Sequence, residues 1–140
     1  VEGTEYTCDV YVDFERRVRC VVPRQRIEVR WGEVSKARVV RDPRIMQVVA
    51  HLVQHLGAGP GVVTVQLFAT ENKALRIIEV NPRFGGGVPL AIRAGADFPK
   101  WILQELLGRR PRIAFDGFED GLVMLRYDSE VWLPAAEAQA

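Results

Sequence analysis

The first third of the chain alternates between apolar and polar residues. From residue 5 to residue 14 this period of two predicts a strand with one buried and one solvent-facing side. The inward positions are Tyr6, Cys8, Val10, Val12 and Phe14, and the outward positions are Glu5, Thr7, Asp9, Tyr11 and Asp13. Residues 14–17 then supply a turn into a second strand.

The second strand changes its apolar parity part-way along. Val18, Cys20 and Val22 are expected to point inward, whereas beyond Pro23 the apolar set becomes Ile27, Val29 and Trp31, which predicts a bulge near Pro23. The polar face then carries Arg24, Arg26, Glu28 and Arg30. These side chains form either a solvated strand face or, if a phosphate site lies on the same sheet, arms around that phosphate.

A helix is predicted from Asp42, an N-cap aspartate followed by Pro43 in the first turn, up to Gly57. Its expected core face is Ile45, Val48, Val49, Leu52 and Leu56. His51 and His55 are four residues apart, but they lack a third ligand and a catalytic glutamate between them. We therefore interpret them as partly exposed helix residues.

Two apolar runs, residues 62–69 and 75–80, are separated by turn residues and predict an antiparallel hairpin. If Glu71 pairs with Ala74 across a two-residue turn, Gln66 lies directly opposite Glu79 and on the same face. A loop of three or five residues would break this register. Otherwise Gln66 is a core glutamine whose amide is satisfied by backbone.

The C-terminal part predicts two helices and a weaker strand pattern. Residues 89–94 form a short helix ending at Gly95, and Asp97 caps a second helix that ends at Gly108, with a core stripe of Ile102, Leu103, Leu106 and Leu107. Residues 121–133 suggest a hairpin through Asp128 and Ser129, and residues 134–140 a frayed tail. The expected fold is α+β, one domain over residues 1–133, with an antiparallel sheet and helices packed on one side.

Composition narrows the function classes. The 140 residues are 48% hydrophobic and 26% charged, with a net charge of +1, which predicts one globular domain and gives no basis for a nucleic-acid or membrane partner. No stretch is long and apolar enough to cross a bilayer, and no signal-peptide pattern is present. Cys8 and Cys20 fit reduced core residues and a cytoplasmic location. A strand pattern beginning so close to Val1 suggests part of a longer protein.

The chemistry concentrates in residues 77–87. Glu79 and Asn81 are two apart on a strand, so they offer oxygens on the same face to one hard cation, most plausibly Mg²⁺, which takes few protein carboxylates beside water and phosphate oxygens. Arg83 follows with a planar fork suited to phosphate, and the glycines 85–87 allow close backbone approach. The alternative is a strand that ends in a proline turn and a glycine loop.

The string Glu79-Val80-Asn81-Pro82-Arg83 before three glycines resembles the metal-binding strand of the ATP-grasp ligases, especially their carbamoyl-phosphate-synthetase-like branch. Residues 2–10 are similar to the strand that opens the second ATP-grasp subdomain, and residues 32–36 to the segment after its partner strand. The resemblance covers residues 2–107 and identifies the chain as the C-terminal half of an ATP-grasp fold.

This resemblance implies a set of functional residues. Gln66, Glu79 and Asn81 would bind Mg²⁺ or Mn²⁺, and Arg83 would act in catalysis by stabilising the transferred phosphoryl group. ATP would be contacted by Arg24, Arg26 and Lys36, and its adenine by Ile78, although strict alternation turns Ile78 away from the face of Glu79. A helix starting near Val88 would point its N-terminal amides at the phosphates.

The implied activity is an ATP-dependent ligase that converts a carboxylate into an acylphosphate for attack by an amine or similar nucleophile. Its other half, an N-terminal substrate domain and first grasp subdomain in cis or in trans, would be required, so this chain alone is expected to be incompetent. One alternative is a non-catalytic nucleotide-binding or partner-docking module, favoured by Gln66 in place of an acid. Another is a structural remnant that binds nothing.

Overall fold

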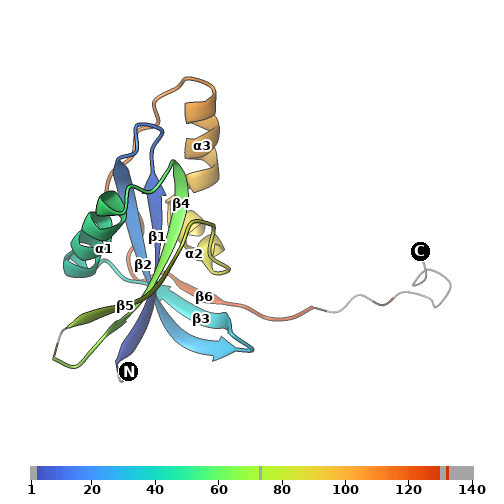
Figure 1. Ribbon diagram of the computed structural model, residues 1–140. Helices are drawn as coiled ribbons and strands as arrows, with labels where there is room; N and C mark the ends of the chain where they lie inside the picture. The colour runs from blue at the N-terminus through green and yellow to red at the C-terminus, as the bar shows by residue number, and fades with distance from the viewer. Residues whose placement is uncertain (1–2, 73, 130–131, 133–140) are drawn as a thin grey trace, which may run out of the picture.

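The computed structural model describes residues 3–72, 74–129 and 132, which form an α+β fold around an antiparallel sheet (Figure 1). Its strands are β1 (Thr4–Val12), β2 (Val18–Arg30), β3 (Glu33–Val39), β4 (Gly61–Ala69), β5 (Leu75–Asn81) and β6 (Val123–Leu125), in the order β5-β4-β1-β2-β3-β6. The helices are α1 (Pro43–His55), α2 (Val88–Arg93) and α3 (Phe98–Leu106). The predicted fold class is confirmed.

Strand β1 lies between β2 and β4 and is buried on both faces. The Tyr11 ring packs 5.3 Å from Trp101 of α3, centroid to centroid, and its hydroxyl donates to Glu105 Oε2 at 2.5 Å. Alternation turns Cys8 and Val10 to the opposite face, toward α1, and Figure 1 shows α1 on one side of the sheet with α2 and α3 on the other. The helices thus cover both faces rather than one. The expected solvent-facing set is wrong for Thr7, Asp9, Tyr11 and Asp13, which are all buried.

The long strand β2 leaves the body of the sheet at its C-terminal end. Its pairing with β1 stops at Gln25, beyond which it pairs with β3 alone, so Ile27, Val29 and Trp31 are exposed instead of inward. Pro23 pairs regularly with Cys8, and the bulge predicted there is wrong: the irregularities lie near Tyr11 and around residues 26–29. Strand β3 was not anticipated from the sequence, because its turn residues, Trp31 and Gly32, include a bulky aromatic.

Helix α1 begins as predicted. The Asp42 carboxylate accepts hydrogen bonds from the backbone nitrogens of Arg44 at 2.9 Å and Ile45 at 3.2 Å. The face it buries is Ile45, Met46, Val49 and Val53, whereas Val48 and Leu56 of the predicted stripe are exposed. The His51 and His55 rings stack 6.4 Å apart on its surface. Among the described residues, no group of three or more His, Cys, Asp or Glu side chains is arranged to hold a metal.

The predicted hairpin register is confirmed where it bears on the site. Gln66 pairs with Glu79, and Thr64 pairs with Asn81. The turn is longer than predicted, since Ala69 pairs with Leu75. A one-residue shift between Gln66 and Leu67 restores the expected partners. The extra residue is Ile78, which is therefore left without a partner on β4.

The C-terminal segment returns to the sheet as an edge strand. Val123–Leu125 pairs with β3, and residues 126–129 continue without regular structure. The second strand and the frayed tail predicted beyond them fall mostly on residues outside the described part of the chain. Helices α2 and α3 form at the predicted positions, but Leu103, Leu106 and Leu107 are exposed and the anchor of α3 is Phe98. No described helix combines the length and apolar character needed to cross a membrane.

Candidate functional site

Strand register places a row of polar side chains across the sheet. Thr7 of β1 pairs with Arg24 of β2 on one side and with Gln66 of β4 on the other, and Gln66 pairs with Glu79 of β5. Paired residues point to the same face of a sheet. This face is the one toward α2 and α3, because Thr7 shares the parity of Tyr11. Residues far apart in the sequence are thereby collected on one surface.

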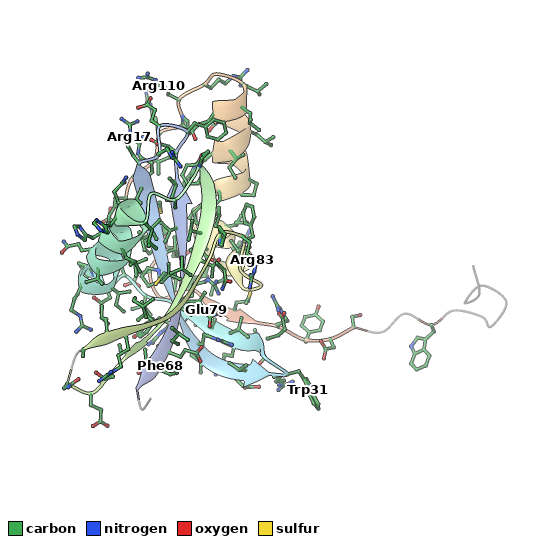
Figure 2. The ribbon with its side chains drawn as sticks, in the orientation of Figure 1. Arg17, Trp31, Phe68, Glu79, Arg83 and Arg110 are labelled. Carbon is green, nitrogen blue, oxygen red and sulfur yellow. The ribbon has the colours of Figure 1, made fainter. Side chains whose placement is uncertain are left out.

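A second row lies beside the first and leads into the glycine loop. Asp9 pairs with Thr64, and Thr64 pairs with Asn81. The Thr64 hydroxyl donates to the Arg83 carbonyl at 2.8 Å, and the Arg83 amide donates to the Asn81 carbonyl at 2.8 Å. These two bonds turn the chain back over the sheet after β5. Figure 2 shows Arg83 near the middle of the molecule, away from Arg17 and Arg110, which lie at its upper end in this view.

A cavity of about 130 Å³ opens between this face and the loop. Its wall includes Arg24, Arg26 and Arg83 together with Gln66 and Thr64, and glycines 85–87 close one side. Within the described part of the chain, Glu33 is the only acid on this wall. Pockets for drug-sized ligands are roughly 300–1,000 Å³, so this cavity suits a phosphoryl or carboxylate group rather than a whole nucleotide. Three guanidinium groups on the wall favour an anion as the ligand, although two of them are also paired with acids, Arg24 with Asp9 and Arg26 with Glu5.

Arg24 forms the base of the cavity. It donates to Asp9 through Nε at 2.6 Å and Nη2 at 3.1 Å, and both side chains are buried. A Cβ atom on Gly87 would lie 2.1 Å from Nη1 of Arg24, so only glycine fits against this guanidinium. The glycine loop and the arginine are therefore packed as one unit.

Arg26 connects the cavity to the predicted metal position. Its Nη1 donates to Glu5 and, at 3.3 Å, to Oε1 of Gln66, and its Nη2 donates to the Gly32 carbonyl at 3.3 Å. The Gln66 side chain therefore has an arginine partner, in place of the backbone partner considered as an alternative. Its oxygen keeps a second lone pair for a metal, but the positive charge of the Arg26 guanidinium beside it opposes the binding of a second cation.

The predicted metal ligands are brought together on β4 and β5. Asn81 Nδ2 donates to Glu79 Oε1 at 2.8 Å, which leaves Asn81 Oδ1 and the second carboxylate oxygen as acceptors. Carboxylate and amide oxygens are hard donors, and a single carboxylate suits Mg²⁺ bound mainly by water and phosphate oxygens. The donor set fits the metal, at the edge of the cavity: Gln66 is on its wall, whereas Glu79 and Asn81 are not.

Two residues that the resemblance implied lie elsewhere. Ile78 is half exposed on β5 at the bulge, and Lys36 lies on β3 opposite Glu28 and Leu125. Neither is part of the cavity wall. Arg83 lies on the wall, and its Nη1 donates to the Phe84 carbonyl at 2.9 Å.

Several residues of the site were missed from the sequence. Glu5, Thr7 and Asp9 share one strand face. The alternation of β1 predicted that this face is exposed to solvent, whereas in the structure its polar residues belong to the site. Arg126 gave no signal at all: it donates to Glu33 Oε2 at 2.7 Å and to the Gly86 carbonyl at 2.5 Å, and it joins the segment after β6 to the glycine loop.

Comparison with known protein families identifies the fold. The family described as "ATP-grasp in the biosynthetic pathway with Ter operon" matches residues 1–127. The chain belongs to this ATP-grasp family. A search of curated proteins gave no match.

Solved structures similar to this ATP-grasp chain include carboxylases. The biotin carboxylase domain of Hydrogenobacter thermophilus 2-oxoglutarate carboxylase, in complex with MgADP, ADP and bicarbonate, has a TM-score of 0.63 at 18% identity, with 86% of this chain and 28% of that chain covered. The ATPase subunit of phosphoribosylaminoimidazole carboxylase from Aquifex aeolicus has a TM-score of 0.62 at 17% identity, with 83% and 36% covered. This chain thus spans about a third or less of the length of either structure.

Proposed function

We propose that this chain binds the phosphates of ATP together with Mg²⁺ and is part of a ligase that activates a carboxylate as an acylphosphate, which an amine or similar nucleophile then attacks. The observation that carries the proposal is the cavity lined by Arg24, Arg26 and Arg83 beside the oxygens of Gln66, Glu79 and Asn81. Cationic walls and hard oxygen ligands at adjacent positions are what phosphoryl transfer requires.

Each side chain has a role that follows from its position. Arg83, on the loop that follows β5, lies where it can neutralise charge on a phosphoryl group or on the acylphosphate. Arg24 and Arg26 hold the anion from the sheet side. Glu79 and Asn81, with Gln66, would hold Mg²⁺, which when bound supplies charge neutralisation at the phosphate oxygens. No nucleophilic side chain is needed, because positioning and charge stabilisation carry the reaction.

The similar structures support this proposal without extending it. The Hydrogenobacter carboxylase domain is described with both MgADP and bicarbonate, a nucleotide and a small carboxylate-like anion. By analogy, the cavity of this chain would receive the phosphoryl group that is transferred from the nucleotide to the carboxylate. The proposal includes an N-terminal ATP-grasp half, in cis or in trans, that contributes further ATP and substrate contacts.

Calorimetric titration of the chain with a non-hydrolysable ATP analogue, with and without Mg²⁺, tests the proposal. We expect binding that requires Mg²⁺ and that weakens about tenfold or more in Glu79→Ala. Glu71→Ala is the matched control, because Glu71 is an exposed acid at the turn of the same hairpin. Absence of binding to the unchanged chain, or equal binding by Glu79→Ala, would contradict the proposal.

One observation favours the second candidate, a non-catalytic nucleotide-binding or partner-docking module. Arg26 donates a hydrogen bond to Gln66, so a positively charged guanidinium already contacts the side chain that is expected to be the third metal ligand. Gln66→Glu distinguishes the two functions. If Mg²⁺ affinity rises in this variant while the unchanged chain binds the analogue equally well without Mg²⁺, the non-catalytic module is the better description.

A further inference from the structure

We infer that Asp9 is a positioning residue that fixes Arg24 as an anion ligand at the base of the cavity. The inference deepens the proposed function and rests on it, because it concerns the same anion site. Asp9 itself does not reach the cavity wall, whereas Arg24 does. Its effect on the anion is exerted through the guanidinium.

The two side chains form a buried, two-point contact. Asp9 is 0% exposed and Arg24 is 1% exposed, and the carboxylate accepts from Nε and Nη2 of Arg24 at 2.6 and 3.1 Å. A fork bound at two adjacent nitrogens cannot rotate about its long axis. The direction of the remaining nitrogen, Nη1, is therefore set by Asp9.

Nη1 of Arg24 lies beside the glycine loop that forms part of the cavity wall. No described residue accepts a hydrogen bond from it. The same part of the chain holds no fully buried side-chain nitrogen or oxygen that lacks a hydrogen-bond partner, so the small exposed fraction of Arg24 includes this nitrogen. It also lies against Gly87, next to glycines that share the wall with Arg83. Its two N–H groups are available to an anion that enters beside Arg83.

Stability alone does not account for this arrangement. A buried ion pair loses much of its Coulomb energy to desolvation, and an apolar pair of similar volume is often as stable or more stable. A second buried aspartate, Asp13, directly after the C-terminal end of β1, shows the contrast. Asp13 is buried too, but its partners Arg17 and Arg19 are partly solvent-exposed and remote from the cavity.

This contrast supplies a matched experiment on the full chain. Asp9→Asn removes the charge and one acceptor, and Asp13→Asn makes the same change in the buried aspartate that follows β1. Affinity for the Mg²⁺-bound ATP analogue is measured by calorimetry, and folding by circular dichroism and urea unfolding. We expect Asp9→Asn to weaken binding about tenfold, Asp9→Glu to recover part of the loss, and Asp13→Asn to bind as the unchanged chain does while losing stability.

A second variant tests the same geometry without touching Asp9. Gly87→Ala puts a methyl group against Nη1 of Arg24 and should displace the guanidinium, whereas Gly59→Ala, which meets no atom within 4 Å, is its control. We expect Gly87→Ala to weaken binding and Gly59→Ala to leave it unchanged. If Asp9→Asn does not fold, this pair decides the question.

The outcomes separate the inference from the proposed function. Normal affinity in folded Asp9→Asn, or in Gly87→Ala, overturns the positioning role while the proposed function stands. An equal loss of affinity in Asp13→Asn also overturns it, since the effect would then follow stability. Failure of the unchanged chain to bind the analogue overturns the proposed function and the inference with it.

Discussion

Burial controls the chemistry of both thiols. It raises the pKa of Cys20 to about 12, with smaller contributions from the carboxylates of Asp116 and Asp9. It also raises the pKa of Cys8 well above its ordinary value, again mainly by desolvation. Both thiols are thus protonated near neutral pH and shielded from solvent.

We predict that iodoacetamide at pH 8 does not alkylate Cys8 or Cys20 in the folded chain and alkylates both in denaturant. Mass spectrometry after timed quenching measures the labelling. The denatured sample is the control for intrinsic reactivity. Labelling of either cysteine in the folded chain at the denatured rate would show that the central strands are open.

Asp13 links stability to pH. Its burial opposes ionisation and is the largest single effect, but hydrogen bonds from the Arg17 amide and from the Arg19 and Arg17 side chains outweigh it, and the pKa of Asp13 is lowered. Because the folded pKa lies below the unfolded one, the stabilisation is full above the unfolded pKa and is lost as pH falls through the folded pKa.

Asp13→Asn should therefore cost about 2 kcal/mol of unfolding free energy at pH 7, and the difference from the unchanged chain should shrink below about pH 4. Urea unfolding at a series of pH values measures it. The exposed residue Asp128, changed to asparagine, serves as control and should show no such trend. A difference that is constant from pH 7 to pH 3 would contradict the assignment.

At the residue scale, the sequence could indicate only those residues of the candidate site that lie within one segment. Glu79, Asn81 and Arg83 are close in the chain, so their spacing on a strand was informative. Asp9 and Thr64 lie on the same face only because their strands pair. In the sequence, alternation cannot distinguish a buried aspartate from a solvent-facing one, because it does not tell whether both faces of the sheet are covered.

Among the elements, the hairpin of β2 and β3 carries backbone strain at its turn. Trp31 has φ of 52° and Gly32 has φ of 81°, while Arg30 pairs with Glu33. Two-residue turns of this type favour Asn-Gly, because a bulky residue at positive φ is disfavoured. The Trp31 side chain is fully exposed, so its removal takes away no packing.

Trp31→Asn is expected to stabilise the chain by about 0.5–1 kcal/mol. Gly32→Ala should have the opposite sign, a loss of about 1 kcal/mol, since an added Cβ meets no atom and only the backbone conformation opposes it. Thermal and urea unfolding of the two variants measure both effects. Opposite signs for the two changes in unfolding free energy support strain at this turn. Destabilisation by Trp31→Asn would mean that the indole makes a packing contact.

The elements that sequence predicted well are those with local signals. The Asp42-Pro43 start of α1 and the pairing of Gln66 with Glu79 depend on caps and on alternation. Strand β3 was missed, since the sequence has no Asn-Gly turn before it and Trp31-Gly32 stands there instead. The prediction that the helices pack on one side of the sheet was wrong for a different reason. Periodicity tells which residues share a face, but it does not tell whether a helix distant in the sequence covers that face. Helix α3 covers Tyr11 in this way.

For the whole molecule, the decisive feature is the size of the cavity relative to the ligand that we propose for it. The cavity has a volume of about 130 Å³ and three arginines on its wall, and Val34 is the one large apolar side chain among its described lining residues, so it has the size and charge for an anion but not for a purine. Ile78, the residue implied for adenine, lies half exposed outside it. Under the proposed function, the described residues would therefore contact the polyphosphate end of ATP rather than its base.

It follows that inorganic tripolyphosphate with Mg²⁺ should bind within about threefold of the ATP analogue, a difference below 1 kcal/mol, while adenosine should show no measurable binding. Competition calorimetry tests whether the two phosphate ligands share one site. Arg83→Ala should weaken both equally, because the arginine contacts only the part they have in common. If adenosine binds, or if the analogue is much tighter than tripolyphosphate, the base has a site on this chain, and Ile78→Ala would show whether β5 supplies it.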